Sequence, residues 1–143
     1  MDKVYVVYWS QTGNTEAMAN MLKEGIEANG AVAELVEAGD ADVSVLLEQK
    51  GFALGCPAMG SEELEDSVVE PLVASLEGKL DGKSLVLFGS YDWGDGEWMR
   101  TWVDRMVEAG ATIIGGEGVI ANNEPDGDAE AALKAVGAEL AAL

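Results

Sequence analysis

Apolar residues gather in five short runs that are typical of buried strands. Residues 4–9 (Val-Tyr-Val-Val-Tyr-Trp) are β-branched or aromatic without interruption, as in a strand that is covered on both faces of a sheet. Residues 51–55 form a shorter run of the same kind. The runs predict strands at residues 4–9, 31–36, 51–55, 84–88 and 112–120, the last with a bulge at Gly115-Gly116.

Between these runs, apolar residues recur at helical spacing. In residues 15–29 they lie three or four positions apart and form one stripe, which Gly30 ends. Pro71 lacks an N–H group and is expected to kink the third of these segments or to delay its start. The spacing predicts helices at residues 15–29, 67–76, 97–109 and 126–143, with a short helix or turn at residues 41–47.

Strand followed by helix, repeated five times, predicts an α/β fold. Apolar strands joined through helices form a parallel sheet, so we expect a doubly wound, five-stranded parallel sheet with helices on both faces. The chain has no repeat or linker, so residues 1–143 are expected to form one domain. Right-handed crossovers bring the strand-to-helix loops to one edge, and such sheets bind ligands where the strand order reverses. The loops after the first, third and fourth strands are therefore the candidates, the last of them predicted at residues 89–96.

The chain is strongly acidic. Its 143 residues include 27 Asp and Glu against 8 Lys and Arg, which gives a net charge of −19. Such a surface repels nucleic-acid phosphates and anionic membranes, and it favours encounters with basic proteins. No apolar run approaches the ~20 residues that span a bilayer, and the first residues do not resemble a secretion signal. We therefore expect a cytoplasmic protein without nucleic-acid or membrane partners.

Two kinds of reactive side chain are missing or rare. The chain has no His, which removes the commonest general base and most zinc sites. A single cysteine excludes an internal disulfide and a cysteine-cluster metal centre, so no metal site is expected. Cys56 also lacks the downstream Arg of a phosphatase loop, because Glu62 stands in that place. We expect Cys56 to be a small buried residue.

Residues 10–15 (Ser-Gln-Thr-Gly-Asn-Thr) join the first strand to the first helix and are rich in hydrogen-bond donors. The free N–H groups and positive dipole of a helix N-terminus attract anions, and Gly13 lets the backbone approach a ligand closely. With no Lys or Arg, the loop suits a permanently bound phosphate monoester better than a phosphate that is transferred. An ordinary helix cap is the alternative interpretation.

The loops after the third and fourth strands suggest walls for a flat ligand. Trp93 lies in a glycine-rich loop, which is a poor place for a core residue, and a ligand stacked on its ring would explain the position. Met59, in the other loop, supplies a conformable opposite wall. The alternative is that Trp93 folds over the sheet edge as a lid on the core.

Together, these three loops resemble those of the flavodoxins. Residues 10–15 match the family's signature for the phosphate of flavin mononucleotide (FMN), and residues 55–62 (GCPAMGSE) and 88–94 (FGSYDWG) match its two flavin-ring loops. The similarity runs the full length of the chain and is greatest to the short-chain, clostridial and Megasphaera-like branch. It implies a sheet of order 2-1-3-4-5, non-covalently bound FMN, and one-electron transport by a protein that is not an enzyme.

The resemblance also implies a role for each loop. Residues 10–15 hold the phosphate, Met59 and Trp93 cover the inner and outer faces of the flavin, and Glu62 accepts a hydrogen bond from the flavin N3–H. Ser90 and Asn123 lie toward the ribityl chain. The residues implied to bind FMN are Ser10, Gln11, Thr12, Gly13, Asn14, Thr15, Pro57, Ala58, Met59, Gly60, Ser61, Glu62, Ser90, Tyr91, Asp92, Trp93, Gly94 and Asn123.

The same resemblance implies a low-potential carrier that cycles mainly between the semiquinone and hydroquinone of FMN. Gly60 has no Cβ and can reverse its peptide, so that its carbonyl accepts a hydrogen bond from the flavin N5–H. Carboxylates near the flavin disfavour its anionic reduced form, each by roughly a few tenths of a kcal/mol. Those close to the ring loops in sequence are Glu62, Glu63, Glu65, Asp66, Glu70, Asp92 and Asp95, and neither loop contains a cation.

The expected partners follow from the charge and the resemblance. A monomeric acidic carrier is expected to meet basic-surfaced redox proteins, such as ferredoxin- or flavodoxin-linked oxidoreductases, in transient encounters.

Three residues depart from the pattern of the nearest relatives. Gln11 and Asp92 stand where Gly is common, and Pro57 removes an N–H group and a hydroxyl that a Ser in its place could offer to the phosphate. Gln11 fits if its φ is ordinary. Asp92 requires either a left-handed backbone or a loop of different shape.

Two other classes of protein share parts of this pattern. An FMN enzyme such as a quinone reductase needs a second substrate pocket and usually a longer chain, and Trp93 would block the outer face of its flavin. A phospho-receiver domain needs acidic residues after the first strand and a Lys after the last. The chain has Trp9-Ser10 and Ile120-Ala121 in those places, which excludes the receiver.

Overall fold

The computed structural model describes residues 2–143, which alternate between strands and helices as the sequence predicts. The elements, in chain order, are β1 (Lys3–Tyr8), α1 (Asn14–Glu27), β2 (Val32–Glu37), the 3-10 helix η1 (Ala38–Asp40), α2 (Val43–Leu47), β3 (Gly51–Gly55), α3 (Val69–Leu76), β4 (Ser84–Tyr91), α4 (Glu97–Glu108), β5 (Thr112–Ile113), β6 (Val119–Asn122) and α5 (Gly127–Ala141).

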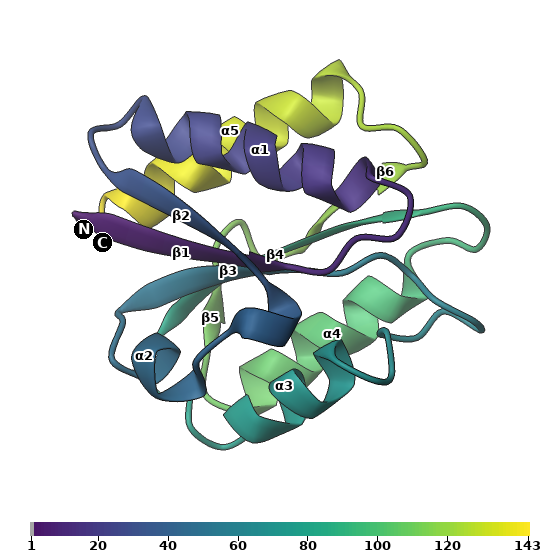
Figure 1. The fold of residues 1–143 in the computed structure, drawn as a ribbon, viewed down its shortest axis with the longest axis horizontal. Coiled ribbons are helices and arrows are strands. Elements are labelled where there is room, and N and C mark those ends of the chain that lie inside the picture. The colour runs from purple at the N-terminus through teal and green to yellow at the C-terminus, as the bar shows by residue number, and fades with distance from the viewer. Residues whose placement is uncertain (1) are drawn as a thin grey trace.

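The sheet is parallel throughout, and its strand order is the predicted one. β1 pairs with β2 on one side and with β3 on the other, and β4 continues the sheet beyond β3. The order β2-β1-β3-β4-β5 reverses direction between β1 and β3. The loops that follow β1, β3 and β4 therefore lie together at the carboxyl edge of the sheet, which is the right-hand edge in Figure 1.

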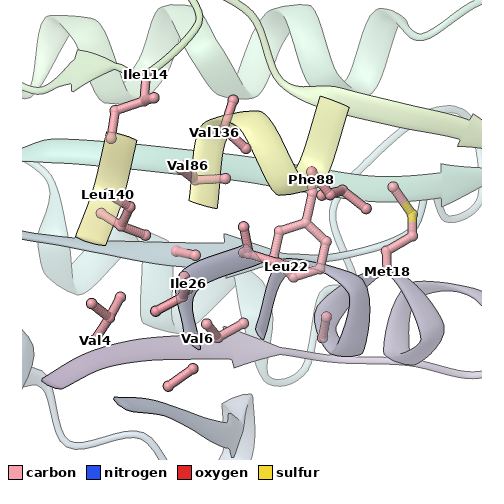
Figure 2. Close-up of a cluster of buried hydrophobic side chains, with 14 of the residues drawn as sticks. Val4, Val6, Met18, Leu22, Ile26, Val86, Phe88, Ile114, Val136 and Leu140 are labelled. Carbon is pink, nitrogen blue, oxygen red and sulfur yellow. The ribbon is translucent and has the colours of Figure 1, made fainter. Parts of the chain in front are cut away.

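Helices cover both faces of the sheet, as expected. α1 and α5 lie on one face, and α2, α3 and α4 lie on the other (Figure 1). Side chains of β4 alternate between the two layers: Val86 and Phe88 pack toward α1 and α5, whereas Leu85 and Leu87 face α3 and α4. Figure 2 shows the first layer, where Val86 and Phe88 meet side chains of β1, α1 and α5.

The fifth position of the sheet differs from the prediction. The expected strand at residues 112–120 is two strands, β5 and β6, which pair with different parts of β4. Between them Gly115 and Gly116 both have positive φ, 84° and 80°, so the chain makes a turn there instead of a bulge. The sheet therefore has six strand segments, with two of them sharing the place of one.

Most other boundaries differ from the predicted ones by one or two residues, and the shifts at β4 and α3 have an evident physical cause. β4 runs on to Tyr91, so the predicted loop of residues 89–96 begins three residues late, because β6 extends the pairing of β4 from Phe88 to Tyr91. α3 begins at Val69, two residues after the predicted start. Pro71 then lies in the first turn of α3, where its missing N–H group has no helical partner to lose.

α1 and α5 pack at very close range. A Cβ on Gly25 of α1 would lie 2.7 Å from the Cα and 2.9 Å from the carbonyl oxygen of Lys134 in α5. On the opposite helix, a Cβ on Gly137 would lie 3.1 Å from the backbone nitrogen of Ile26. These glycines therefore serve as sites of helix contact.

We expect Gly25→Ala to lower the free energy of unfolding by about 2 kcal/mol, because the added methyl group would overlap backbone atoms that must move. Chemical denaturation measures this change. Gly127→Ala is the matched control, since Gly127 lies in the first turn of α5 with no atom within 4 Å of an added Cβ. It should be neutral or stabilising by up to about 1 kcal/mol. Equal effects of the two variants would contradict this account of the packing.

Candidate functional site

A cleft of about 300 Å³ lies at the carboxyl edge of the sheet, where the loops after β1, β3 and β4 meet. Small-molecule sites in proteins begin at about this size. All residues that line it belong to the set proposed from sequence: Gln11, Thr12, Asn14, Pro57, Ala58, Met59, Gly60, Glu62, Ser90, Tyr91, Asp92, Trp93 and Asn123.

The loop after β1 ends in the N-terminus of α1. The Ser10 Oγ accepts hydrogen bonds from the backbone N–H groups of Gly13 and Glu16, both at 3.2 Å, and so caps the helix. Among the described residues, the backbone N–H groups of Thr12, Asn14 and Thr15 find no acceptor. Ser10 therefore caps the helix, as the alternative interpretation predicts, and the remaining donors are available to an anion, so the phosphate site stays a prediction.

Thr15 does not line the cleft. Its side chain is buried, and its Oγ1 lies 2.9 Å from the Oγ of Ser90 at the end of β4. The backbone N–H of Ser90 also donates to the same oxygen, at 3.3 Å. Thr15 therefore joins the first loop to β4, and Ser90 is the member of this pair that faces the cleft.

The loop after β3 is a small hairpin. The backbone N–H of Met59 donates to the carbonyl of Glu63, and the N–H of Glu63 donates back to Met59, both at 2.8 Å. Gly60, Ser61 and Glu62 form the turn between them, and Gly60 and Glu62 have positive φ, 53° and 56°. A Cβ on Gly60 would meet no atom within 4 Å, so its peptide lies in open space.

Glu62 connects this hairpin to α4. Its Oε1 accepts from the backbone N–H of Gly96 at 3.1 Å, and its Oε2 accepts from that of Glu97 at 3.0 Å. The carboxylate is thus a cap for α4, and the positive end of the helix dipole stabilises its charge. It lies directly over Gly94, where a Cβ would be 2.4 Å from Oε1. Gly94 does not line the cleft, but because it has no side chain it leaves room for the Glu62 carboxylate.

The loop after β4 is held from β6. The backbone N–H of Asn123 donates to the carbonyl of Tyr91 at 2.7 Å, and the Asn122 Nδ2 donates to the carbonyl of Asp92 at 3.1 Å. Trp93, next in the chain, is 62% exposed and belongs to neither core layer. The alternative that Trp93 is a lid on the core is therefore wrong, and its ring is available at the cleft.

The φ angles show how Gln11 and Asp92, which depart from the pattern of the nearest relatives, fit their loops. Among the described residues other than glycine, only Glu62 and Asn123 have positive φ. Gln11 thus keeps an ordinary backbone and fits its loop. Asp92 does not adopt the left-handed conformation that was one of its two predicted options.

Cys56 is a structural residue, as expected. It is fully buried, and this burial raises the pKa of its thiol to about 12, so it remains protonated at neutral pH. Its carbonyl oxygen accepts a hydrogen bond of 3.1 Å from the indole N–H of Trp98. The carbonyl thus links Cys56 to α4, while the thiol donates to the Pro57 carbonyl at 3.3 Å and accepts from the backbone N–H of Glu65 at 3.5 Å.

The seven carboxylates that lie close to the ring loops in sequence differ in where they point and in whether a cation pairs with them. Only Glu62 and Asp92 line the cleft. Glu65 is buried away from it and faces the start of α3. Asp95 and Glu70 form ion pairs with Arg100 at 3.0 Å and Arg105 at 2.7 Å. The negative surroundings of the cleft thus consist of fewer free charges than the sequence implies.

Sequence reasoning missed three residues that shape the site: Asn122, Trp98 and Arg100. Each acts on one of the loops from outside it, and Arg100 does so through hydrogen bonds to the carbonyl and carboxylate oxygens of Asp95. A motif search confined to the loops does not reach them. Ser61, at the apex of the hairpin, is a predicted residue that the structure leaves outside the cleft lining.

No helix within residues 2–143 combines the length and the hydropathy needed to cross a membrane.

Comparison with known proteins places the chain in one family. A sequence model of that family, the flavodoxins, matches residues 6–135. The flavodoxin of Megasphaera elsdenii is 54% identical over 123 residues, which cover 86% of this chain and 88% of that protein. The flavodoxin of Clostridium beijerinckii is 43% identical over 121 residues, covering 85% and 87%.

Solved structures agree with the sequence comparison. The solution structure of two-electron reduced M. elsdenii flavodoxin superposes with a TM-score of 0.89, covering 98% of this chain and 99% of that one at 49% identity. A flavodoxin from the domain Archaea gives a TM-score of 0.79 at 28% identity, with coverage of 98% and 96%. The resemblance to the flavodoxins is thereby confirmed, and the chain belongs to the flavodoxin family of FMN-binding electron carriers.

Proposed function

We propose that this chain holds FMN in the 300 Å³ cleft, with the flavin ring at Met59 and Trp93 and the phosphate at residues 10–15. The observation that carries the proposal is the composition of the cleft: helix-terminal N–H donors at one end and the two ring walls at the other. Bound FMN accepts and donates electrons one at a time, and the protein adjusts the free energy of each step.

The phosphate end fits a monoester. The N–H groups of Thr12, Asn14 and Thr15 are without partners among the described residues, and the hydroxyl of Thr12 adds a side-chain donor. Of the residues that the structure describes, no Lys or Arg lines the cleft. Neutral donors at a helix N-terminus suffice for an anion that stays bound.

The ring end fits a flat aromatic group. The exposed indole of Trp93 would be covered by a stacked ring, and the flexible Met59 side chain would pack on the other face. Each oxygen of Glu62 accepts one backbone N–H, which leaves a lone pair for the flavin N3–H. Backbone groups from Tyr91 to Gly94 would then meet the pyrimidine end, and Ser90 and Asn123 the ribityl chain.

Two features of the chain favour a low potential. Glu62 and Asp92 line the cleft without a paired cation among residues 2–143, and each carboxylate disfavours added negative charge by roughly a few tenths of a kcal/mol after screening. The Gly60–Ser61 peptide makes no hydrogen bond within residues 2–143, so it is free to turn its carbonyl toward a protonated ring nitrogen.

A reductive titration tests this proposal. The purified chain, reconstituted with FMN and titrated with dithionite, should take up two electrons in separate one-electron steps, the second at a potential well below that of free FMN. Rapid oxidation of NADH or NADPH without an added reductase would instead favour an FMN enzyme. Failure to bind FMN would overturn the proposal outright.

We further propose that the carrier works as a cytoplasmic monomer and meets basic-surfaced redox proteins in short encounters. A net charge of −19 steers basic partners over the range set by the Debye length, which salt shortens. Such a partner is expected to carry a surface patch of Lys and Arg beside its own redox centre.

The bimolecular rate of electron transfer from the reduced chain to a small basic haem protein should fall about tenfold or more between roughly 10 mM and 500 mM ionic strength. Stopped-flow absorbance measures it. A small uncharged oxidant serves as the control, and its rate should stay within about twofold over the same range. A salt-independent rate with the basic protein would contradict electrostatic steering.

A further inference from the structure

We propose that the first turn of α4 is a two-point clamp on the flavin loop at residues 56–63, and that Trp98 is its positioning residue. This inference rests on the proposed placement of FMN, because that loop supplies Met59 and Glu62. None of the loop motifs includes Trp98, which lies more than 30 residues after this loop in the chain.

The first point of the clamp is the Cys56 end. The Trp98 indole is 2% exposed, and its N–H donates to the Cys56 carbonyl at 3.1 Å in the protein interior. The backbone is close here: a Cβ on Gly89 would lie 2.0 Å from the Cys56 carbonyl oxygen and 3.3 Å from the Trp98 ring. Such a buried carbonyl has no room for a replacement donor, so the indole N–H fixes where the loop begins.

The second point is the Glu62 end. Gly96 gives α4 no side-chain cap of its own, and the backbone N–H groups of Gly96 and Glu97 bind the Glu62 carboxylate instead. The two points come from three consecutive residues, 96–98, so the loop is held at both ends by one rigid helical turn.

Between the two points, two neighbouring peptides stay free of hydrogen bonds within residues 2–143. Ala58 is fixed because its N–H donates to the Ser90 carbonyl at 3.0 Å, and Met59 and Glu63 are fixed by their mutual pair. The two peptides at the apex, Gly60–Ser61 and Ser61–Glu62, lack a partner within residues 2–143. The clamp thus confines conformational change to these two peptides, and it keeps the Met59 wall in place while the Gly60–Ser61 peptide turns.

Trp98 also reaches the second flavin loop. Its ring lies 5.7 Å, centroid to centroid, from that of Tyr91, tilted by 48°. Tyr91 lines the cleft at the start of the Trp93 loop. One side chain of α4 therefore contacts the beginnings of both ring loops, and its hydrogen bond holds only the first of them.

The test compares Trp98→Phe with Trp102→Phe. Both indoles are almost fully buried one helical turn apart, but the Trp102 N–H has no acceptor among the described residues. The control therefore removes an indole N–H and some volume without removing a hydrogen bond. In the full-length chain without FMN, amide hydrogen exchange at Ala58, Met59 and Glu63 should be about tenfold faster in Trp98→Phe than in Trp102→Phe. The exchange rates of the β2 amides should be equal in the two variants.

Ligand binding gives the second readout. Trp98→Phe should raise the Kd of FMN and of riboflavin by the same factor, about tenfold, because Met59 and Glu62, which this loop supplies, are proposed to contact the ring that both ligands share. With FMN at saturation, the visible circular dichroism of the flavin should change in Trp98→Phe and not in Trp102→Phe. A loss of overall stability alone would leave that spectrum unaltered.

Unchanged exchange in Trp98→Phe, or an equal rise in both variants, would overturn the clamp. Faster exchange with unaltered affinities would overturn the role of the clamp in cofactor binding and the placement of the ring at this loop. The exchange measurement, made without FMN, separates these two failures.

Discussion

Glu65→Gln is expected to lower the free energy of unfolding by about 3 kcal/mol at neutral pH. The carboxylate is buried and accepts from the backbone N–H groups of Ser67, Val68 and Val69, at 2.8 to 2.9 Å, and from the Ser67 hydroxyl. It thereby replaces the helical partners that the first residues of α3 lack. An amide in its place accepts through one oxygen only and leaves buried N–H groups unpaired.

The same carboxylate makes stability depend on pH in a defined window. Burial raises its pKa, but the four hydrogen bonds outweigh burial and lower the pKa from 4.5 to about 2. A carboxyl group with a depressed pKa in the folded state stabilises the fold above its unfolded pKa, and this contribution is lost as the pH falls toward the folded value. The difference in stability between the parent chain and Glu65→Gln should therefore be constant above about pH 5 and should vanish near pH 2.

Urea unfolding at several pH values measures both effects. Glu63→Gln is the matched control, since Glu63 is exposed and forms its hydrogen bonds within the described chain through the backbone alone. Its effect should stay within about 0.5 kcal/mol. If the two variants behave alike, or if the Glu65 difference persists unchanged at pH 2, the capping role of Glu65 is wrong.

The sequence predicts the sheet well because its signals are local. A run such as residues 4–9 is buried on both faces wherever it lies, and alternation with helices then dictates parallel strands and right-handed crossovers. The loops at the carboxyl edge follow from that topology. The topology thus points to the loops, and the resemblance of these loops to the flavodoxins supplies the individual residues, which include all those that line the cleft.

The contacts that fix those loops are not local. The Glu62 carboxylate and its partner Glu97 are 35 residues apart, and Trp98 and Cys56 are 42 apart. Nothing in the sequence near Glu62 says that α4 lacks a cap. The division of the last strand into β5 and β6 likewise depends on which part of β4 each segment meets. Pairing partners of this kind emerge only when the whole chain is folded.

The charges near the cleft likewise depend on contacts between residues far apart in the sequence, so they could not be predicted from it. The sequence places seven carboxylates close to the ring loops, but the fold turns Glu65 toward α3 and pairs Asp95 and Glu70 with arginines of α4. Both arginines lie outside the loops in sequence, yet Arg100 binds Asp95 of the loop after β4 and Arg105 binds Glu70 of α3. The potential of bound FMN therefore depends on the orientation of each carboxylate, which the net charge of the chain does not reveal.

Trp93→Ala is expected to raise the Kd of FMN by about 100-fold, or about 3 kcal/mol. Stacking of one nucleic-acid base on an aromatic side chain contributes roughly 1–3 kcal/mol, and the three-ring flavin covers the indole more completely. Because Trp93 is largely exposed and lies outside both core layers, its loss should change the free energy of unfolding by less than about 0.5 kcal/mol.

The two ends of the cleft can be separated with riboflavin, which lacks the phosphate. Trp93→Ala should weaken FMN and riboflavin by the same factor, since both present the same ring. Thr12→Ala should weaken FMN by about tenfold and leave riboflavin unchanged, because the Thr12 hydroxyl lies at the helix-terminal end of the cleft. Fluorescence titration of the flavin gives all four constants. If Trp93→Ala weakens FMN by less than about threefold, stacking on Trp93 contributes too little to hold the flavin, and the ring must lie elsewhere.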